Sequence, residues 1–330
     1  MAMWRRQPEP MQPQMEILDL RHFTSADLRT LLEQETREWS RFLAWDYRSS
    51  AEMILRYIDA KILPGYAAVC NGVPVGYSFF VYEGSKGVIG DLFVSPRFSD
   101  PAHETEKGLL KHVIETLQQS PGVHRLEAQL LIHNAGSLAA PFLNAGFRRY
   151  PRIFMTLPLQ PATTYLSSEV HVPADLEVRR WSEQDYHPVA SLITAAYRGH
   201  VDSDINDQYR SLTGALRFLN NIVRFPGCGV FDPKASFVAI QRSTRALIGV
   251  ILCSRVKDDV GHVTQVCLMP EHRGCGIGEA LLHATASELQ SRGFSLLSLT
   301  VTEANTGAVR LYRRLGYNAE HIFDAFVWEG

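Results

Sequence analysis

The chain has 330 residues, of which 45% are hydrophobic and 10% aromatic, enough for two domains with apolar cores. Its formal net charge is −2 and its lysines and arginines form no run, so we expect no nucleic-acid partner. No apolar segment is long enough to cross a membrane or to serve as a signal core, which predicts a cytoplasmic protein without a membrane partner. The five cysteines form no C-x-x-C pair, so we expect reduced thiols and no metal site: Cys70, Cys228, Cys253, Cys267 and Cys275.

Two polar, proline-containing stretches divide the chain. Residues 1–14 are expected to be a disordered N-terminal segment. A second such stretch begins at Gln160 and ends near Pro173, and it breaks both the helical and the strand periodicity, so 161–175 is predicted to be a linker. The folded parts are then 15–160 and 176–330.

The second part alternates strand and helix patterns. We expect helices over 190–197, 214–224, 279–292 and 306–315, the third of them ended by Gly293. Strands are expected over 236–239, 248–255, 263–268, 294–299 and 322–328. The order predicts an α/β domain around a mixed sheet.

A glycine-rich turn stands between the strand at 263–268 and the helix that follows. Gly274, Gly276 and Gly278 allow a tight turn with little side-chain bulk, so several N–H groups point outward at a helix N-terminus and form a phosphate cradle. No earlier strand of a nucleotide fold precedes the turn, which excludes a dinucleotide-binding fingerprint. A P-loop is excluded too, because neither lysine nor hydroxyl follows the glycines.

The pattern R-x-x-G-x-G, formed by Arg273, Gly276 and Gly278, resembles the acyl-CoA pyrophosphate loop of the GNAT superfamily of N-acyltransferases. The likeness continues through Asn305 into Leu311-Tyr312-Arg313-Arg314-Leu315-Gly316-Tyr317, which is similar to the family's asparagine, helix and terminal signature. A glycine turn without a ligand is the alternative. The resemblance implies an α/β fold, acetyl-CoA as cosubstrate, and an amine acceptor.

Matching residues recur about 170 positions apart: Pro96 and Pro270, Asn134 and Asn305, Gly146 and Gly316. We therefore expect two tandem domains of this family, each a mixed, mostly antiparallel sheet flanked by helices. The first copy, residues 15–160, is interpreted as a degenerate domain that serves as a scaffold or helps to shape the substrate cleft. Its segment 97–104 has no glycine and carries Asp100, Pro101 and Glu104 where a diphosphate would bind, and Phe142 stands where the second copy has Tyr312. A second active site of another kind is the alternative.

The resemblance also implies roles for the residues of the second copy. Tyr312 is expected to protonate the leaving thiolate, and the Leu268 N–H to polarise the thioester carbonyl. The residues expected to bind the cofactor are Cys267, Leu268, Met269, Arg273, Gly274, Cys275, Gly276, Ile277, Gly278, Asn305 and Tyr312. The other reading of Tyr312 is a core tyrosine, because it shares a helical face with Ala308, Leu311 and Leu315.

The general base and the acceptor are open. Many family members carry a carboxylate before the strand bulge, whereas this chain has Thr264 and Gln265 there, which leaves His262 and Glu303 as candidates. His200, Asp202 and Asp204 are candidate acceptor-binding residues that would attract a cationic amine, or else belong to a solvated loop.

Two classes of function follow. The first is an N-acetyltransferase that moves an acetyl group from acetyl-CoA to a primary amine, of a small molecule or a peptide, by direct attack in a ternary complex. The second is a non-catalytic acyl-CoA sensor. A monomer or a homodimer is expected in either case.

Overall fold

The computed structural model describes residues 15–159, 173–224 and 229–330. The predicted segment 1–14, most of the predicted linker and Cys228 lie outside the described residues. Within them, no helix is long and apolar enough to cross a membrane.

The first half contains six strands and four α-helices among its described residues. They are β1 (Met15–Asp19), α1 (Ser25–Leu43), α2 (Arg48–Asp59), β2 (Gly65–Cys70), β3 (Val73–Glu83), β4 (Lys86–Val94), α3 (Glu104–Gln118), β5 (Arg125–Gln129), α4 (Ala139–Asn144) and β6 (Arg148–Pro158). A short 3-10 turn, Leu20–His22, joins β1 to α1.

The second half repeats this order, with an extra helix α7, an extra strand β8 and 3-10 turns at 183–185, 207–210 and 270–272. Its elements are β7 (Leu176–Arg180), α6 (Tyr186–Ala196), α7 (Val201–Ile205), α8 (Leu212–Arg224), β8 (Val230–Phe231), β9 (Phe237–Gln241), β10 (Leu247–Lys257), β11 (Val260–Leu268), α9 (Ile277–Ser291), β12 (Leu296–Thr302), α10 (Thr306–Arg314) and β13 (Asn318–Glu329). Every helix and strand expected from the sequence of this half is present, with ends that differ by a few residues.

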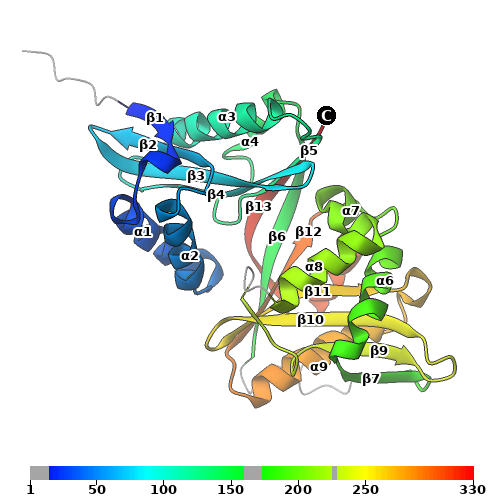
Figure 1. The fold of residues 1–330 in the computed structure, drawn as a ribbon. Coiled ribbons are helices and arrows are strands. Elements are labelled where there is room, and N and C mark those ends of the chain that lie inside the picture. The colour runs from blue at the N-terminus through cyan, green and yellow to red at the C-terminus, as the bar shows by residue number, and fades with distance from the viewer. Residues whose placement is uncertain (1–14, 160–172, 225–228) are drawn as a thin grey trace, which may run out of the picture.

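The strands of both halves form one continuous sheet. Its order is β1-β2-β3-β4-β5-β13-β6-β12-β11-β10-β9-β7, with β8 paired to β10. Among the described residues only β4–β5 and β11–β12 pair in parallel. Helices cover both faces of each half: α3 lies opposite α1 and α2, and α9 lies opposite α6 and α8 (Figure 1). The predicted α/β fold with mixed, mostly antiparallel sheets is confirmed.

The two halves exchange their last strands. β6 of the first half pairs with β12, whereas β13 of the second half pairs with β5 and β6 (Figure 1). Each half therefore needs a strand from the other to complete its sheet.

In each half, two neighbouring parallel strands stop pairing and separate at an equivalent place in the sheet. The parallel pairing of β11 with β12 ends at Val263↔Leu299, although β11 continues to Leu268 and β12 to Thr302. A bulge in the β10–β11 ladder falls at the same level, between Leu252 and Cys253. In the first half, the pairing of β4 with β5 likewise ends at Ile89, beside a bulge in β3. This shared opening is structural evidence for the predicted repeat, and it exposes backbone groups on the edge of β11.

Candidate active site

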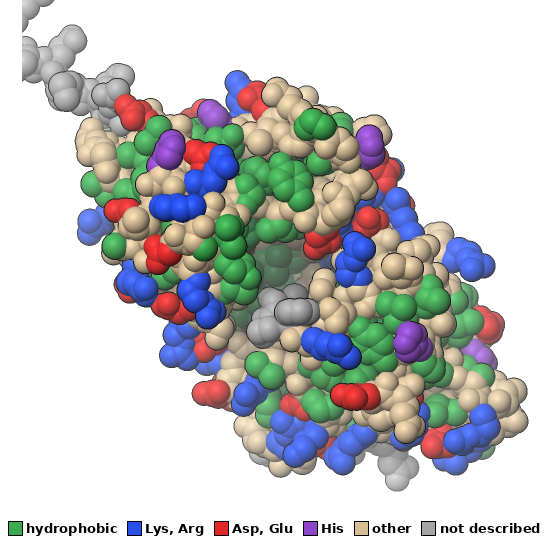
Figure 2. Space-filling view, viewed as in Figure 1, with side chains coloured by type: hydrophobic (Ala, Val, Ile, Leu, Met, Phe, Trp, Pro, Cys, Tyr) green, Lys and Arg blue, Asp and Glu red, His purple; other side chains and the backbone are tan. Residues whose placement is uncertain are grey.

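A cavity of about 1240 Å³ lies where the two halves meet. The surface is hollowed there, with hydrophobic side chains in its wall (Figure 2). The second half supplies the glycine turn, the edge of β11 and the start of α10, and the first half supplies side chains from the α1–α2 region, β4, β5 and β6. One continuous space therefore connects the glycine turn to the first half.

The glycine turn has the geometry of an anion cradle. Gly274 and Gly276 have φ of 77° and 80°, a left-handed conformation that favours glycine. Gly276 is the N-cap of α9, so the first N–H groups of that helix face outward with the positive end of its dipole. The carboxylate of Glu279 is held 2.7 Å from Arg314 on α10. Gly274, Gly276 and Gly278 line the cavity, whereas Ile277 is buried in the core and Cys275 is exposed.

Arg273 connects the turn to α6. Its guanidinium donates to the carbonyl of Ala196, with an N–O distance of 2.6 Å, and it lines the cavity beside the glycines. Arg273 and the three glycines of the predicted cradle thus line one cavity, whereas the Ile277 side chain is buried in the core.

The open edge of β11 forms the next part of the wall. Thr264, Gln265, Val266, Cys267 and Leu268 all line the cavity. Burial raises the pKa of the Cys267 thiol to about 12, so Cys267 is a neutral thiol at physiological pH. The N–H of Met269 donates to Ile248 with an N–O distance of 2.9 Å, so it is already used within the sheet. Met269 is partly buried against the core.

Tyr312 lies on α10. Its side chain packs in the hydrophobic core and also lines the cavity. It is 6% exposed and packs against Tyr317 with a centroid distance of 5.7 Å. Burial, and then the nearby charge of Asp202, raises the pKa of the Tyr312 hydroxyl well above its ordinary range. The hydroxyl is therefore protonated at neutral pH and available as a proton donor. Tyr312 is therefore a core residue that also lines the cavity.

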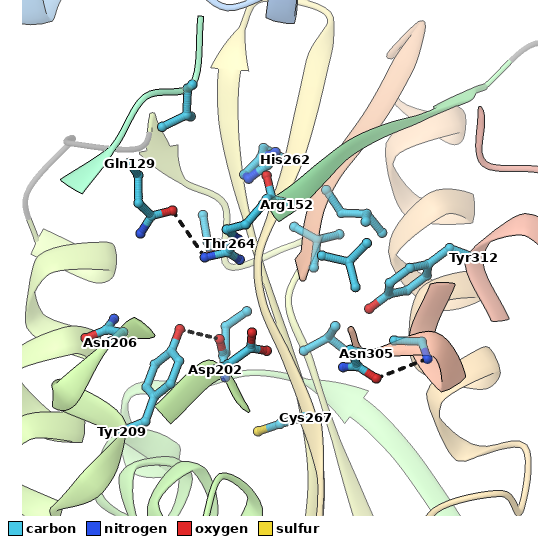
Figure 3. Close-up of a pocket in the computed structure, with 18 of the residues that line it drawn as sticks. Gln129, Arg152, Asp202, Asn206, Tyr209, His262, Thr264, Cys267, Asn305 and Tyr312 are labelled. Carbon is cyan, nitrogen blue, oxygen red and sulfur yellow. Dashed lines mark hydrogen bonds between the residues drawn. The ribbon is translucent and has the colours of Figure 1, made fainter. Parts of the chain in front are cut away.

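Asn305, His200 and Asp202 gather at the start of α10. Asn305 caps the helix through its Oδ1, which accepts from the Ala308 N–H, and its Nδ2 lies 3.4 Å from Nε2 of His200. The Thr302 hydroxyl donates to the Asp202 carboxylate. All three predicted residues line the cavity, and Figure 3 shows Asp202 and Asn305 there.

Asp204 and Glu303, also predicted as site residues, do not line the cavity. Asp204 lies 3.7 Å from Arg210, with 48% of its side chain exposed. Glu303 is exposed, and its N–H donates to the Pro151 carbonyl.

His262 faces the first half of the protein. The Ser298 hydroxyl donates to the Gly261 carbonyl, so it accepts from Nδ1–H of His262 at 2.9 Å. The remaining nitrogen, Nε2, then carries a lone pair. Burial, and secondly the positive charge of Arg152, lowers the pKa of His262 to about 3. His262 is a neutral hydrogen-bond acceptor, and it is a weak base for taking up a whole proton.

Gln265 occupies one of the two positions on β11 where the expected carboxylate is absent from this sequence. Its Nε2 donates to the Tyr197 hydroxyl at 3.0 Å, and its Oε1 accepts from the Tyr209 hydroxyl at 3.3 Å. The two tyrosine rings stack at 4.3 Å. The position is therefore a neutral hydrogen-bonded network.

The individual residues that the first half contributes to the site were not identified from the sequence. Trp39, Trp45, Tyr47, Asp91, Gln129 and Arg152 all line the cavity. The close spacing of three aromatic residues before Arg48 was the available signal.

The turn of the first half that matches the cradle is closed by its own side chains. Asp100 accepts from the N–H of Ala102 at 2.7 Å and of Glu104 at 3.4 Å, at the start of α3. A carboxylate thus occupies the helix N-terminus that a phosphate would need. Phe142 is fully buried and stacks on Phe326 at 4.0 Å.

Comparisons with known proteins agree with this geometry. The model of the Acetyltransferase (GNAT) family matches residues 203–317. A mycothiol acetyltransferase of Arthrobacter sp. is 43% identical over 262 residues, 77% of this chain and 73% of that protein. Another from Thermobispora bispora is 40% identical over 93 residues, 26% of this chain and 31% of that protein. For three of the mycothiol acetyltransferases, the one from Thermobispora bispora included, the similarity to this chain spans no more than a third of the relative's length.

Solved structures share the fold over nearly the whole chain. A GCN5-related N-acetyltransferase from Sphaerobacter thermophilus superposes with a TM-score of 0.67 at 18% identity, covering 96% of this chain and 95% of that one. A tandem GNAT protein from the clavulanic acid biosynthesis pathway gives 0.61 at 15% identity, covering 96% and 98%.

A cradle at a helix N-terminus, a split sheet and a two-fold repeated domain define an acyltransferase class of protein. The chain belongs to the GNAT acetyltransferase family, in its tandem two-domain form.

Proposed function

We propose that the protein is an N-acetyltransferase that moves an acetyl group from acetyl-CoA to a primary amine, with attack inside a ternary complex. The observation that carries the proposal is that the Tyr312 hydroxyl, kept protonated by burial, lies on the same cavity as the glycine cradle. A proton donor and an anion site in one enclosed space are what acyl transfer from a thioester to an amine requires.

The residues present fit acetyl-CoA. The outward N–H groups of the turn at 274–278 suit a pyrophosphate, because the left-handed glycines keep side chains away from it. A Cβ at Gly274 would meet no atom within 4 Å, so the outer side of the turn is open to a ligand. The unpaired edge of β11 suits the amide groups of the pantetheine arm. When bound, acetyl-CoA supplies the activated acetyl group.

Each of the following residues of the chain would then have a separate role in the reaction. The backbone N–H of Leu268 would stabilise the negative charge that develops on the thioester oxygen, and Asn305 would position the cofactor arm. Tyr312 would give its proton to the leaving thiolate. The network of Gln265, Tyr197 and Tyr209 would exclude water beside the reacting atoms.

Asp202 is the residue to which we assign the amine. Its side chain is 16% exposed, it lines the cavity, and its charge acts on both Tyr312 and Tyr209. A carboxylate there attracts an ammonium ion and accepts its proton, which compensates for the absence of a carboxylate on β11. His262 is less suited to that role because its lowered pKa keeps the ring neutral, so it has no negative charge to attract an ammonium ion.

The relatives named mycothiol acetyltransferase make mycothiol without its acetyl group one acceptor to test. The experiment is release of the CoA thiol from acetyl-CoA with a panel of amines, that acceptor included. Turnover with any amine supports the enzyme. The alternative, a non-catalytic acyl-CoA sensor, is favoured by the neutral network at Gln265. Tight acetyl-CoA binding without turnover on the whole panel would favour it.

A further inference from the structure

Arg152 is a cation without a protein counter-ion in the wall of the cavity. It lies on β6, and no carboxylate of the described residues comes within 4.0 Å of its guanidinium. Among those residues, the guanidinium makes one side-chain hydrogen bond, from Nη1 to the Gln129 amide oxygen at 3.1 Å. Its Nε is closed off from solvent and has no partner in the described part of the chain. A guanidinium offers five donors, so most of its capacity is unused.

A second buried donor stands on the same cavity. The indole Nε1–H of Trp45 has no partner among the described residues, although Trp45 is only 8% exposed. Trp45 packs edge-on against His262 at 4.8 Å, and the charge of Arg152 acts on His262. Both of these nitrogens are closed off from solvent, so a ligand in the cavity would meet the Nη groups of Arg152, whose hydrogen bond to Gln129 is exposed.

The acidic groups on this side of the cavity do not neutralise Arg152. Burial raises the pKa of Asp91 to about 7, and Asp91 accepts a hydrogen bond from Tyr47. Glu35 is fully buried, burial raises its pKa well above the ordinary value, and its two oxygens accept from Tyr77 and Trp39. A ligand carboxylate in the cavity would give Arg152 the counter-charge that neither of these two groups supplies.

The sheet register puts this site next to the proposed amine site. Arg152 on β6 is the direct partner of Thr302 on β12, and the Thr302 hydroxyl donates to Asp202. Directly opposed residues in an antiparallel pair project from the same face of the sheet. Arg152, His262, Asp202 and Tyr209 are drawn around one space (Figure 3).

We propose that the amine acceptor also carries a carboxylate, which Arg152 binds while Asp202 holds the amine. The acceptor class is thus an amino acid, or an amino-acid conjugate with a free carboxylate close to its primary amine. A carboxylate matches the planar fork of a guanidinium with two hydrogen bonds, whereas the neighbouring Gln129 holds the fork in place. This inference rests on the proposed acetyl transfer, because it names the substrate of the same site.

The test compares each of several amino acids with its own carboxamide, for example alanine, leucine, phenylalanine and glutamine. The wild-type protein is expected to prefer the acids in kcat/KM for CoA thiol release. In Arg152→Gln, the ratio of acid to amide is expected to fall about 10- to 100-fold, the size of a lost charge-assisted hydrogen-bonded pair. Acetyl-CoA affinity should not change. Phosphoethanolamine against ethanolamine is the third arm, and a preference for the phosphate over every carboxylate would overturn the proposal.

The control variant is Arg148→Gln, which removes a cation from the same strand where 56% of the side chain is exposed. It should leave the acid-to-amide ratio unchanged. Arg152→Lys is the second variant, because it retains the charge without the fork and should lose most of the preference. The wild-type comparison of acids with amides decides the matter even where a variant does not fold.

The outcomes separate this inference from the proposed function. Thiol release with amines but with no preference for acids would overturn the inference and leave the acetyltransferase. If no amine is acetylated, calorimetry with the same pairs in the presence of CoA still decides. Tighter binding of acids, lost in Arg152→Gln, would then support the carboxylate site, and equal binding would reject it.

Discussion

Trp45 of the first half lies edge-on against His262 of the second half, with ring centroids 4.8 Å apart and planes at 71°. The next residue, Asp46, donates its N–H to the carbonyl of Val256 at 2.8 Å. These two contacts fasten the loop between α1 and α2 onto β10 and β11. Residues of both halves therefore form the wall of the cavity at this end, and neither half forms it alone.

The strand exchange predicts how the second half behaves alone. A fragment of residues 170–330 would leave β12 without β6, and β13 without both of its partners. Long unpaired strand edges promote aggregation, so we expect poor solubility or loss of amine turnover. Expression with size-exclusion chromatography and a thiol-release assay measures both. A soluble and fully active fragment would show that the first half is not needed as a scaffold.

Much of the second half followed from its sequence because local signals decide it. The tight glycine turn, the helix that begins after Asn305 and the stop at Gly293 depend on signals within a few residues, and the structure has them where they were expected. The exchange of β6 and β13 depends on pairing between residues more than 100 positions apart, which no local pattern records.

The cavity wall was harder to predict for the same reason. Arg152 and Asp202 are joined only through the pairing of β6 with β12, and Trp45 meets His262 only when the halves pack together. Asp204 lies two residues from Asp202, yet one turns to Arg210 and the other to the cavity. The sequence indicated the loop that carries both carboxylates, but only the folded structure shows that Asp202 and not Asp204 lines the cavity.

Gly276→Glu is expected to abolish acetyl-CoA binding. The added carboxylate would project at the N-terminus of α9 and repel a diphosphate, and a side chain is strained at φ of 80°. Gly293→Glu is the matched control, since Gly293 has φ of 81° with open space around it at the other end of the same helix. Calorimetry should show no binding for the first variant and one site per chain for the second. Two equivalent sites in the wild type would contradict the inactive first copy.

Changes to that first copy should leave acetyl-CoA affinity nearly unchanged. Asp100→Ala removes the carboxylate that accepts from the Ala102 and Glu104 N–H groups before α3, and the loss of a hydrogen bond costs about 0.5–1.5 kcal/mol of stability. The expected result is a lower melting temperature with the same dissociation constant. A new, second acetyl-CoA site in Asp100→Ala would show that this carboxylate alone had blocked the first copy.

Asp91 makes stability depend on pH. Burial raises its pKa from 3.8 to about 7, so the folded protein holds this proton more tightly than the unfolded chain does. The contribution to stability is complete below about pH 4 and is lost as pH rises through about 7. Asp91→Asn retains an acceptor for the Tyr47 hydroxyl and removes this titration. Its melting temperature should fall less than that of the wild type between pH 5 and pH 8.5.

Glu35 titrates in the same direction, so the dependence in Asp91→Asn should shrink without vanishing. Glu104→Gln, at a side chain 71% exposed, is the control and should follow the wild type. Parallel curves for wild type and Asp91→Asn would mean that the carboxyl group of Asp91 is not perturbed by its burial.

Tyr312→Phe tests the proposed acid most directly. The substitution retains the ring and its packing on Tyr317, while it removes the hydroxyl that lines the cavity. General acid catalysis contributes about 10²–10⁴-fold, and a thiolate is a fairly good leaving group, so we expect a fall in kcat near the lower end of that range. Acetyl-CoA affinity and melting temperature should stay close to the wild type. Tyr317→Phe is the comparison, because it removes a hydroxyl from the same core without reaching the cavity, and kcat should change little. If Tyr312→Phe lost stability in proportion to its rate, the residue would be a core tyrosine, and an unchanged kcat in a folded variant would remove it from the mechanism.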